Sequence, residues 1–430
     1  MKKSEQILKR LESLHPKQID LSLDRTLNLL NKIGNPQNKL PPTIHVAGTN
    51  GKGSTIAFLR SIFEANNYNV QVYTSPHLIN FNERIRINSK IISNELLINL
   101  LEECEFYNKK SPITFFEITT AAAYLGFSRM KSDILLLETG LGGRFDATNV
   151  IPTTICSVIT PISMDHMSFL GNSIKSITKE KVGIFKKNIP AVISDQNEEA
   201  IQVIRDESQR KKVKLYEYKK YWKVNQINKK SFKLKIGNEL FKVPMPNLFG
   251  DHQIYNSGTA MTVAKVQKHL TLQDKLIFDG IKKTFWPARM QKIESGKLKH
   301  ISGRDLEIWL DGGHNEHASN MLLDNLKKWK EGNLFLIFGM LNNKEPKEFL
   351  DKIINYFQSI YVIPIINHLF ITTRQIKEIY KEKNKIIKSS LSVNEALKNL
   401  RGENKKGKVI ICGSLYLAGD VLKENGTLIN

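Results

Sequence analysis

The most informative stretch of this chain is His45-Val46-Ala47-Gly48-Thr49-Asn50-Gly51-Lys52-Gly53-Ser54-Thr55. β-Forming residues predict a strand over 43–47, and Ile56, Leu59 and Phe63 recur afterwards at helical spacing. The glycines between the two elements let backbone N–H groups turn inward, while Lys52 and the start of the helix add positive charge. The stretch therefore predicts a strand–loop–helix unit that cradles a polyphosphate.

This loop departs from the general phosphate-loop pattern at two positions. Val46 stands where the pattern has its first glycine, and Gly53 stands where Ser or Thr normally follows the lysine. The alternative is a tight strand-to-helix turn that carries a surface lysine. We favour the phosphate loop because strand and helix both lie where the pattern requires them.

Length and composition predict two domains or one large one, with no nucleic-acid partner. The chain has 430 residues, of which 41% are hydrophobic, and a formal net charge of +22. Its lysines are scattered, without a dense arginine tract or basic repeats interleaved with aromatic residues, which favours a solvated surface over a nucleic-acid interface. The positive field would gather anionic substrates.

The cysteines and the N-terminus indicate a cytoplasmic protein. Cys104, Cys156 and Cys412 are far apart and lack metal-site spacing, so we expect buried free thiols in a reducing compartment. The first residues lead into a charged helix, and we expect neither a signal peptide nor a membrane-spanning segment.

Hydrophobic periodicity predicts an α/β fold with two domains. Continuous apolar strands separated by helices, for example around 119–123 and 174–184, indicate a mostly parallel sheet like that of phosphate-loop proteins. Alternation at Phe232, Leu234 and Ile236 before Gly237-Asn238 predicts a small antiparallel hairpin within the first domain. A break near 286–289 predicts a boundary, giving domains 1–286 and 287–430, the second a smaller Rossmann-like unit. The predicted strands lie at 70–73, 134–138, 155–159, 191–193, 306–310, 334–338, 360–363, 385–387 and 409–412.

Several polar residues follow strand ends, where ligands bind in open α/β sheets. Ser75, Glu138 and the pair Asp165-His166 could form a Mg²⁺ site beside the cradle, although Glu138 could instead cap a helix and His166 could be an ordinary polar histidine. Lys181 resembles any helix lysine. Asp311-Gly312-Gly313-His314-Asn315 suits either nucleotide contact or a tight turn.

Taken together and in order, these motifs resemble the folylpolyglutamate synthase family, often bifunctional as dihydrofolate synthase, within the Mur-ligase-type superfamily. The resemblance covers nearly the whole chain. Its motifs are 48–54, Ser75-Pro76-His77-Leu78 with Glu83-Arg84-Ile85, Thr114-Phe115-Phe116-Glu117, 138–149, Asp165-His166 with Leu170-Gly171, 250–253 with Asn256, 311–315 and Gly413-Ser414-Leu415-Tyr416.

The resemblance implies roles for individual residues. Lys52, His166 and Lys181 would be catalytic, with Lys181 carbamylated so that it offers an oxygen. The implied ATP contacts are Thr49, Asn50, Gly51, Lys52, Gly53, Ser54, Asn256, Arg289, Asp311 and His314. The implied Mg²⁺ ligands are Ser75, Glu138 and, for a second ion, His166. The implied pterin or folate contacts are Asp20, Leu21, Ser22, Thr114, Phe115, Phe116, Asp146 and Ala147.

The implied activity is ATP-dependent ligation of L-glutamate to a pteroate or folate carboxylate through an acyl phosphate. The implied cofactors are ATP, two Mg²⁺ ions and K⁺, and the implied partners are small-molecule substrates of a monomer. The alternative within ligases is a cell-wall Mur enzyme, which the motifs at 75–78 and 114–117 disfavour. A nucleic-acid-binding phosphate-loop protein and a nucleotide-gated switch are the alternatives from other classes.

Three residues depart from the family pattern. Ala288 replaces a usual glycine before Arg289, which disfavours a positive φ there. Gly313 and Val182 each replace a usual alanine, Val182 beside Lys181.

Overall fold

The computed structural model describes residues 3–17, 19–225, 227–329 and 332–429, and it divides into two compact units. The first unit comprises residues 1–77, 81–247 and 253–284, and the second comprises 78–80, 248–252 and 285–430. The division after Thr284 lies two residues before the boundary that the sequence suggests. Two short segments from the first part of the chain also group with the second unit.

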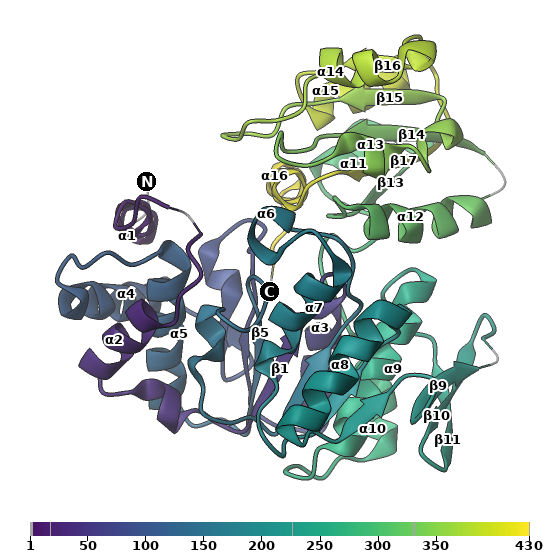
Figure 1. Cartoon of the computed structure of the whole chain (residues 1–430). Coiled ribbons are helices and arrows are strands. Elements are labelled where there is room, and N and C mark those ends of the chain that lie inside the picture. The colour runs from purple at the N-terminus through teal and green to yellow at the C-terminus, as the bar shows by residue number, and fades with distance from the viewer. Residues whose placement is uncertain (1–2, 18, 226, 330–331, 430) are drawn as a thin grey trace. The chain divides into compact units, whose positions relative to one another are not determined.

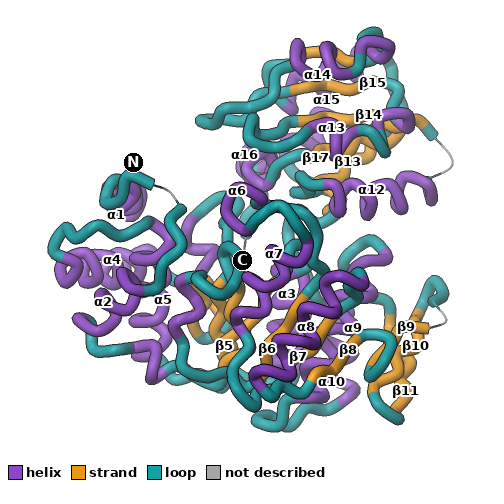
Figure 2. The backbone as a smooth tube through the Cα atoms, viewed as in Figure 1, coloured by secondary structure: helices purple, strands orange, loops and turns teal. Residues whose placement is uncertain are grey.

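The first unit is built on an eight-stranded sheet with the order β4-β3-β2-β5-β1-β6-β7-β8 (Figures 1 and 2). The parallel strands of this sheet are β2, β5, β1, β6, β7 and β8, whereas β3 and β4 add an antiparallel edge beside β2. The strands are β1 (Thr43–Ala47), β2 (Val70–Tyr73), β3 (Ile85–Ile87), β4 (Lys90–Ile91), β5 (Ile134–Glu138), β6 (Cys156–Ile159), β7 (Ala191–Ile193) and β8 (Leu215–Glu217). The central strands are buried along their whole length, which explains their continuous apolar sequences.

Helices supply the rest of the core of this unit. Leu135 and Leu137 of β5 share a hydrophobic cluster with α4 and α5, whereas Ile159 and Ile193 share one with α7 and α8. Gly280 of α10 lies against the backbone of Ile62 in α3, an approach that a side chain would block. The helices are α1 (Lys3–Glu12), α2 (Asp24–Lys32), α3 (Lys52–Ala65), α4 (Asn94–Asn108), α5 (Phe115–Arg129), α6 (Met167–Leu170), α7 (Ile174–Lys181), α8 (Glu198–Lys211), α9 (Asp251–Val266) and α10 (Asp274–Lys283), with 3₁₀ turns at Pro36–Lys39, Phe81–Arg84, Ala147–Val150 and Val182–Ile184.

The predicted hairpin is confirmed as part of a three-stranded antiparallel sheet, β9 (Trp222–Asn225), β10 (Ser231–Ile236) and β11 (Glu239–Pro244). Phe232, Leu234 and Ile236 are buried, and the lysines between them are exposed. Gly237 turns the chain with φ +57°.

The second unit contains a six-stranded sheet with the order β12-β13-β17-β14-β15-β16, parallel except for β12. Its strands are β12 (Gln291–Ile293), β13 (Leu306–Leu310), β14 (Asn333–Phe338), β15 (Ser359–Val362), β16 (Ile387–Ser389) and β17 (Gly407–Cys412). Its helices are α11 (Lys297–Ser302), α12 (Glu316–Lys328), α13 (Pro346–Leu350), α14 (Thr373–Ile379), α15 (Val393–Gly402) and α16 (Leu415–Asn425), with 3₁₀ turns at Ile354–Tyr356 and Lys381–Lys383. The predicted α/β fold with a small antiparallel sheet is therefore confirmed. The strand predicted at 385–387 lies two residues later.

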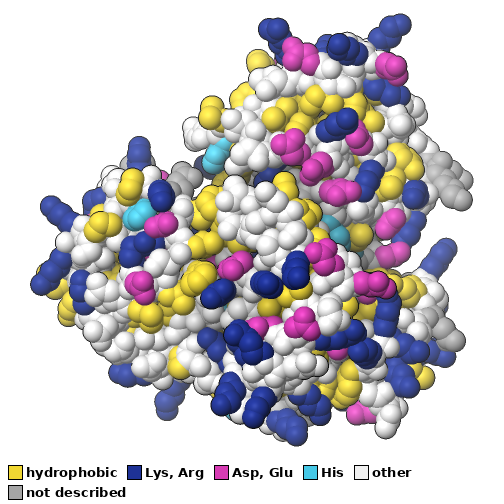
Figure 3. Space-filling view, in the orientation of Figure 1, with side chains coloured by type: hydrophobic (Ala, Val, Ile, Leu, Met, Phe, Trp, Pro, Cys, Tyr) yellow, Lys and Arg dark blue, Asp and Glu magenta, His cyan; other side chains and the backbone are white. Residues whose placement is uncertain are grey.

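The surface and the cysteines agree with the composition. Lysine and arginine side chains are spread among acidic ones over the visible face (Figure 3). Cys104, Cys156 and Cys412 are free and buried, and burial raises the pKa of each thiol. Among the residues described, no helix is both long and apolar enough to cross a bilayer.

Candidate active site

The loop between β1 and α3 is held in its turn by close backbone approaches. Gly51 has φ +86°, and a Cβ at that position would lie 2.7 Å from Oδ1 of Asn256. A Cβ on Gly48 would overlap the hydroxyl of Thr160 at the end of β6. Both positions therefore need glycine, which explains the composition of the loop.

The start of this loop is anchored to the segment after β6. The backbone N–H of Thr49 donates to the carbonyl of Pro161 at 2.9 Å, and its hydroxyl donates to the carbonyl of Ser163 at 3.1 Å. The side-chain amide of Asn50 contacts the hydroxyl of Ser163 at 3.4 Å. Because β1 and β6 are neighbouring parallel strands, their carboxyl ends bring these two loops together.

Two lysine amines converge on one carbonyl of the loop. Nζ of Lys52, the first residue of α3, donates to the carbonyls of Gly48 and Thr49, both at 3.2 Å. Nζ of Lys181, the last residue of α7, donates to the carbonyl of Gly48 at 2.8 Å. A lysine with no distinguishing feature in the sequence is thus part of the predicted phosphate cradle.

The surroundings of Lys181 change its acid–base behaviour. Burial, and then the charge of Lys52, lower the pKa of Lys181 to about 7, although the carboxylates of Asp165 and Asp146 oppose this shift. About half of the amines with such a pKa are neutral near pH 7, and only the neutral form is a nucleophile.

The predicted metal ligands Ser75 and Glu138 lie together at the ends of β2 and β5. The backbone N–H of Ser75 donates to Oε2 of Glu138 at 3.2 Å, and Glu138 is buried. One carboxylate with a hydroxyl beside it suits Mg²⁺, which takes few protein ligands and completes its shell with phosphate oxygens and water. The residues therefore fit the ion that the sequence suggests. Within the described part of the chain, no group of three His, Cys, Asp or Glu side chains is arranged around a common metal position.

His166 lies at the N-cap of α6 with φ +51°. Its backbone N–H donates to Oδ1 of Asp165 at 2.9 Å, and its ring Nε2 lies 3.9 Å from Oδ2 of the same residue. The side chain is 42% exposed, so it can reach a ligand in solution. The carboxylate of Asp165 also opposes the lowering of the pKa of Lys181, so the 165–166 pair lies near that amine.

Helix α9 contributes polar side chains to the loop. Nδ2 of Asn256 donates to Oε1 of Gln253 at 3.0 Å, and Nε2 of Gln253 donates to the hydroxyl of Ser54 at 3.3 Å. With the approach of Asn256 to Gly51, these contacts bring the predicted ATP contact Asn256 to the loop across 205 residues of sequence.

The predicted pterin residue Asp146 is a buried carboxylate held by several donors. It accepts from the N–H of Leu141 at 2.8 Å and from the N–H and the hydroxyl of Thr148 at 3.0 and 2.5 Å. The hydroxyl of Thr148 also contacts Nε2 of the buried His45 at 2.9 Å. Burial raises the pKa of Asp146, while these donors oppose the shift. Ala147 follows in the 3₁₀ turn and is buried.

Thr114, Phe115 and Phe116 form the start of α5. The side chains of Thr114 and Glu117 make a reciprocal capping box at the N-terminus of the helix. The ring of Phe116 fills the space beside Gly140, where a Cβ would lie 2.5 Å from its Cζ. The ring of Phe115 lies edge-on to Phe81, at a centroid distance of 5.7 Å.

The remaining predicted pterin residues, Asp20, Leu21 and Ser22, precede α2. Leu21 packs against the hydrophobic cluster that α7 and α8 share. The hydroxyl of Ser22 accepts from the N–H of Asp24 at 3.2 Å. Asp20 forms an ion pair with Arg25, at 2.9 Å from Nη1.

The other predicted nucleotide contacts belong to the second unit, where Asp311 organises two turns. Its carboxylate accepts from the N–H groups of Met290 at 2.8 Å and Gly313 at 2.7 Å. Burial raises the pKa of Asp311, and the charge of Arg289 opposes this. Nδ1 of His314 contacts the carbonyl of Gly312 at 3.1 Å.

Ala288 adopts the conformation that its sequence disfavours. Its φ is +54°, a left-handed value that costs an alanine roughly 1 kcal/mol. Hydrogen bonds hold it there: its N–H donates to Oε1 of Gln291 at 3.0 Å, and its carbonyl accepts from Gly312 at 2.9 Å. Alanine is therefore tolerated at this position with local backbone strain, which the two hydrogen bonds offset.

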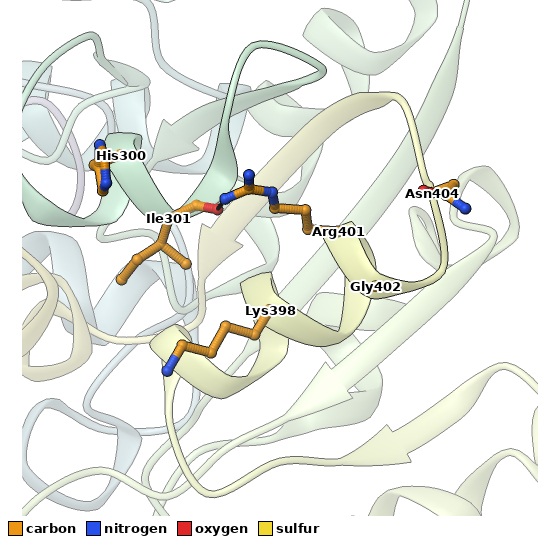
Figure 4. A pocket seen from close by; sticks show the side chains of 6 residues that line it. All are labelled: His300, Ile301, Lys398, Arg401, Gly402 and Asn404. Carbon is orange, nitrogen blue, oxygen red and sulfur yellow. Dashed lines mark hydrogen bonds between the residues drawn. The ribbon is translucent and has the colours of Figure 1, made fainter.

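A surface pocket in the second unit contains none of the predicted site residues. It lies between α11 and α15, where the ends of both helices contribute to its wall (Figure 4). Its lining residues are His300, Ile301, Lys398, Arg401, Gly402 and Asn404. We therefore place the candidate active site at the strand ends, not in this pocket.

Sequence reasoning did not single out Ser163, Gln253 or Arg25 as individual contributors. Each acts through contacts between segments far apart in the chain, for which a single sequence carries no signal. Only Glu117 had a readable signal beyond its place in a motif, because Thr-x-x-Glu before an apolar run marks a capping box.

The chain is similar to proteins of known family along nearly its whole length. Two family models match the chain: the Mur ligase middle domain over residues 46–264 and the C-terminal domain of dihydrofolate synthetase over residues 291–424. The dihydrofolate synthase/folylpolyglutamate synthase of Bacillus subtilis is 32% identical over 420 residues, covering 93% of this chain and 94% of that protein. The dihydrofolate synthetase of Saccharomyces cerevisiae is also 32% identical, covering 94% of this chain and 98% of that protein.

Solved structures show the same fold. Escherichia coli FolC in complex with DHPP and ADP has a TM-score of 0.88 and 29% identity, covering 98% of this chain and 97% of that chain. A bifunctional folylpolyglutamate synthase/dihydrofolate synthase with Mn, AMPPNP and L-glutamate bound has a TM-score of 0.86 and 28% identity, covering 98% and 97%. The chain therefore belongs to the folylpolyglutamate synthase/dihydrofolate synthase family of Mur-type ligases.

Proposed function

We propose that this protein joins L-glutamate to the carboxylate of a pteroate or folate substrate, with hydrolysis of ATP to ADP and phosphate. The observation that carries the proposal is the cradle around Gly48, where Lys52 and Lys181 meet beside the pair of Ser75 and Glu138. The substrate class is supported by relatives that are named dihydrofolate or folylpolyglutamate synthases. It is also supported by similar solved structures, which hold ADP and DHPP in one case and L-glutamate in another.

The chemistry solves the poor reactivity of a carboxylate. A carboxylate oxygen attacks the γ-phosphorus of ATP, the bond to ADP breaks, and an acyl phosphate forms. The amine of glutamate then attacks the acyl carbon, loses a proton, and expels phosphate to leave the amide. Most of the catalysis in such transfers comes from positioning and charge neutralisation.

Individual residues take roles that follow from their placement. Lys52 and the N–H groups of 49–54 would hold the phosphates, and Asn256 would contact the nucleotide beside Gly51. Ser75 and Glu138 would hold Mg²⁺, which neutralises charge on phosphate oxygens when bound. His166 would serve a second ion. The lowered pKa of Lys181 supports its carbamylation, because a neutral amine adds to CO₂ and releases a proton to give a carbamate oxygen.

Other roles extend the proposal. Asp146, Phe116 and the 20–22 segment would contact the pterin, whereas Arg289, Asp311 and His314 would contact the nucleotide from the second unit. We also propose a K⁺ site, action as a monomer, and a cytoplasmic location, which the free buried cysteines support.

Release of ADP tests the proposal. With ATP, Mg²⁺ and L-glutamate present, dihydropteroate and tetrahydrofolate are added separately, and each that is a substrate should release ADP and gain one glutamate by mass. A response to UDP-muramoyl substrates alone would favour a cell-wall Mur ligase. ADP release without an acceptor, or none with any acceptor, would contradict both ligase functions.

A further inference from the structure

Two predicted pterin-contacting segments, 20–22 and 114–116, lie far apart in the sequence, and one side chain joins them. Arg25, in the first turn of α2, extends toward both. Its Nε and Nη2 donate to Oε2 and Oε1 of Glu117 at 3.0 and 2.9 Å, in a bidentate pair. Its Nη1 donates to Oδ2 of Asp20 at 2.9 Å, and Nη2 also donates to the carbonyl of Asp20 at 2.8 Å.

Glu117 transmits this contact to the start of α5. The residue is 3% exposed, and its Oε2 accepts from the backbone N–H of Thr114 at 2.7 Å. The hydroxyl of Thr114 in turn accepts from the N–H of Glu117 at 3.3 Å. One carboxylate therefore binds both the guanidinium and the first backbone group of the segment that presents Phe115 and Phe116.

The segment at 20–22 needs such a restraint. Residues 19–23 adopt neither helix nor strand, so no backbone ladder fixes them. Ordering each residue of such a segment costs backbone entropy, which contacts must offset. The other ion pairs of Asp20 are longer, at 3.7 Å to His15 and 3.9 Å to Lys17. The bonds from Arg25 are the short ones, and they reach both the side chain and the main chain.

The chemistry of this network suits positioning better than stability. A largely buried ion pair recovers little net stability because desolvation of the charges offsets their attraction. A planar guanidinium with two bonds to one carboxylate and two to another residue fixes orientation as well as distance. Hydrogen bonds to Glu117 and the nearby carboxylates raise the pKa of Arg25, so it stays charged.

We infer that Arg25 is a positioning residue that sets the spacing between the 20–22 segment and the start of α5, and hence the width of the folate site. The inference rests on the proposed function. Displacement of a binding group by about 1 Å can cost roughly a hundredfold in rate. Loss of Arg25 should therefore act on the folate substrate and leave the ATP site unchanged.

The test compares variants at Arg25 with a matched ion pair elsewhere in the same unit. Arg205 also makes a bidentate pair with a mostly buried carboxylate, that of Glu217, with Nε donating to Oε1 at 3.3 Å and Nη2 to Oε2 at 2.7 Å, between α8 and β8. Arg25→Ala should raise KM for the pteroate or folate substrate about 10- to 100-fold with little change in KM for ATP. Arg25→Lys keeps the charge but loses the bidentate geometry, so its increase should be smaller. Arg205→Ala should leave both KM values unchanged.

Each outcome decides the inference. An Arg25→Lys variant that folds provides the measurement if Arg25→Ala does not. If KM for folate is the same in the Arg25 variants, in Arg205→Ala and in wild type, the positioning role is wrong. The proposed function still stands in that case, provided that the wild-type enzyme turns over folate. Equal increases in KM for folate and for ATP would also overturn the positioning role. A wild-type enzyme without folate-dependent turnover would overturn both.

Discussion

Removal of CO₂ should inactivate this enzyme reversibly, because the Lys181 amine has the properties that carbamylation requires. Its Nζ is buried beside the phosphate loop, 2.8 Å from the carbonyl of Gly48. Burial and the charge of Lys52 lower the pKa of Lys181 to about 7. The carbamate would convert a buried cation into an anion that offers oxygen atoms for a metal ion.

The size of the effect follows from the neutral fraction of the amine. With a pKa of about 7, roughly half of the Lys181 side chains are neutral at pH 7. An ordinary lysine with a pKa near 10.4 would be neutral in only about 0.04% of molecules. The reactive form is thus enriched about a thousandfold. At constant dissolved CO₂, the rate of carbamylation should rise with pH up to about 7 and then level off, because the neutral amine is the reactive form, whereas the rate at an exposed lysine would continue to rise.

The assay follows turnover and a ¹³C label together. Enzyme kept in CO₂-free buffer should lose at least about tenfold in kcat, and bicarbonate should restore it. Enzyme equilibrated with ¹³C-bicarbonate should show a carbamate carbon signal that Lys181→Met removes. Lys186→Met is the matched control, since Lys186 is also largely buried, with a pKa lowered to about 8 by burial and then by Lys211, and donates to the carbonyl of Asn149.

Two results would contradict a functional carbamate on Lys181. Turnover that is equal in CO₂-free and CO₂-equilibrated buffer would show that no carbamate is needed. A ¹³C carbamate signal that survives in Lys181→Met and disappears in Lys186→Met would show that Lys186, not Lys181, carries the modification.

Three further substitutions have defined outcomes. Lys181→Met should raise the free energy of unfolding of the ligand-free protein by up to about 5 kcal/mol at pH 7, measured by urea unfolding. Between about pH 7 and 10.5 the unfolded wild-type chain binds more protons than the folded one, so wild-type stability rises with pH and the difference should shrink. A difference that stays constant with pH would contradict this prediction. Glu138→Ala should lower kcat at least about 100-fold in a protein with a native circular-dichroism spectrum. Full activity of this variant would contradict the proposed Mg²⁺ site at Glu138. Gly140→Ala should displace the ring of Phe116, lower the free energy of unfolding by about 1–3 kcal/mol in thermal unfolding, and raise KM for folate. In the control Gly402→Ala, the added Cβ meets nothing within 4 Å, so stability should stay unchanged or rise. Equal stability of the two variants would contradict the packing argument.

The sequence predicted those features that short-range patterns encode. The parallel strands read as apolar runs because both of their faces are buried, and the hairpin read as alternation because one face is exposed. The loop at 48–54 was recognisable despite its irregular spacing because strand and helix flank it. The predicted grouping of Ser75 with Glu138 followed from strand ends that share one edge of the sheet.

Contacts across long stretches of sequence were not predictable from local patterns. Lys181 approaches Gly48 from 133 residues away, and no periodicity distinguishes it from other helix lysines. Arg25 reaches Glu117 across 92 residues. At Ala288 the residue type disfavours a positive φ, but hydrogen bonds made in the folded state, one to Gln291 and one from Gly312, hold it at +54°.

The fate of a labelled oxygen shows whether the amide forms through an acyl phosphate. A pteroate or folate substrate carrying ¹⁸O at both oxygen atoms of the reacting carboxylate is incubated with the enzyme, ATP, Mg²⁺ and L-glutamate, and the released phosphate is analysed by mass spectrometry. We expect one ¹⁸O atom in each phosphate for each amide formed, because that oxygen bridges carbon and phosphorus in the acyl phosphate. Amide formation with unlabelled phosphate would contradict this expectation.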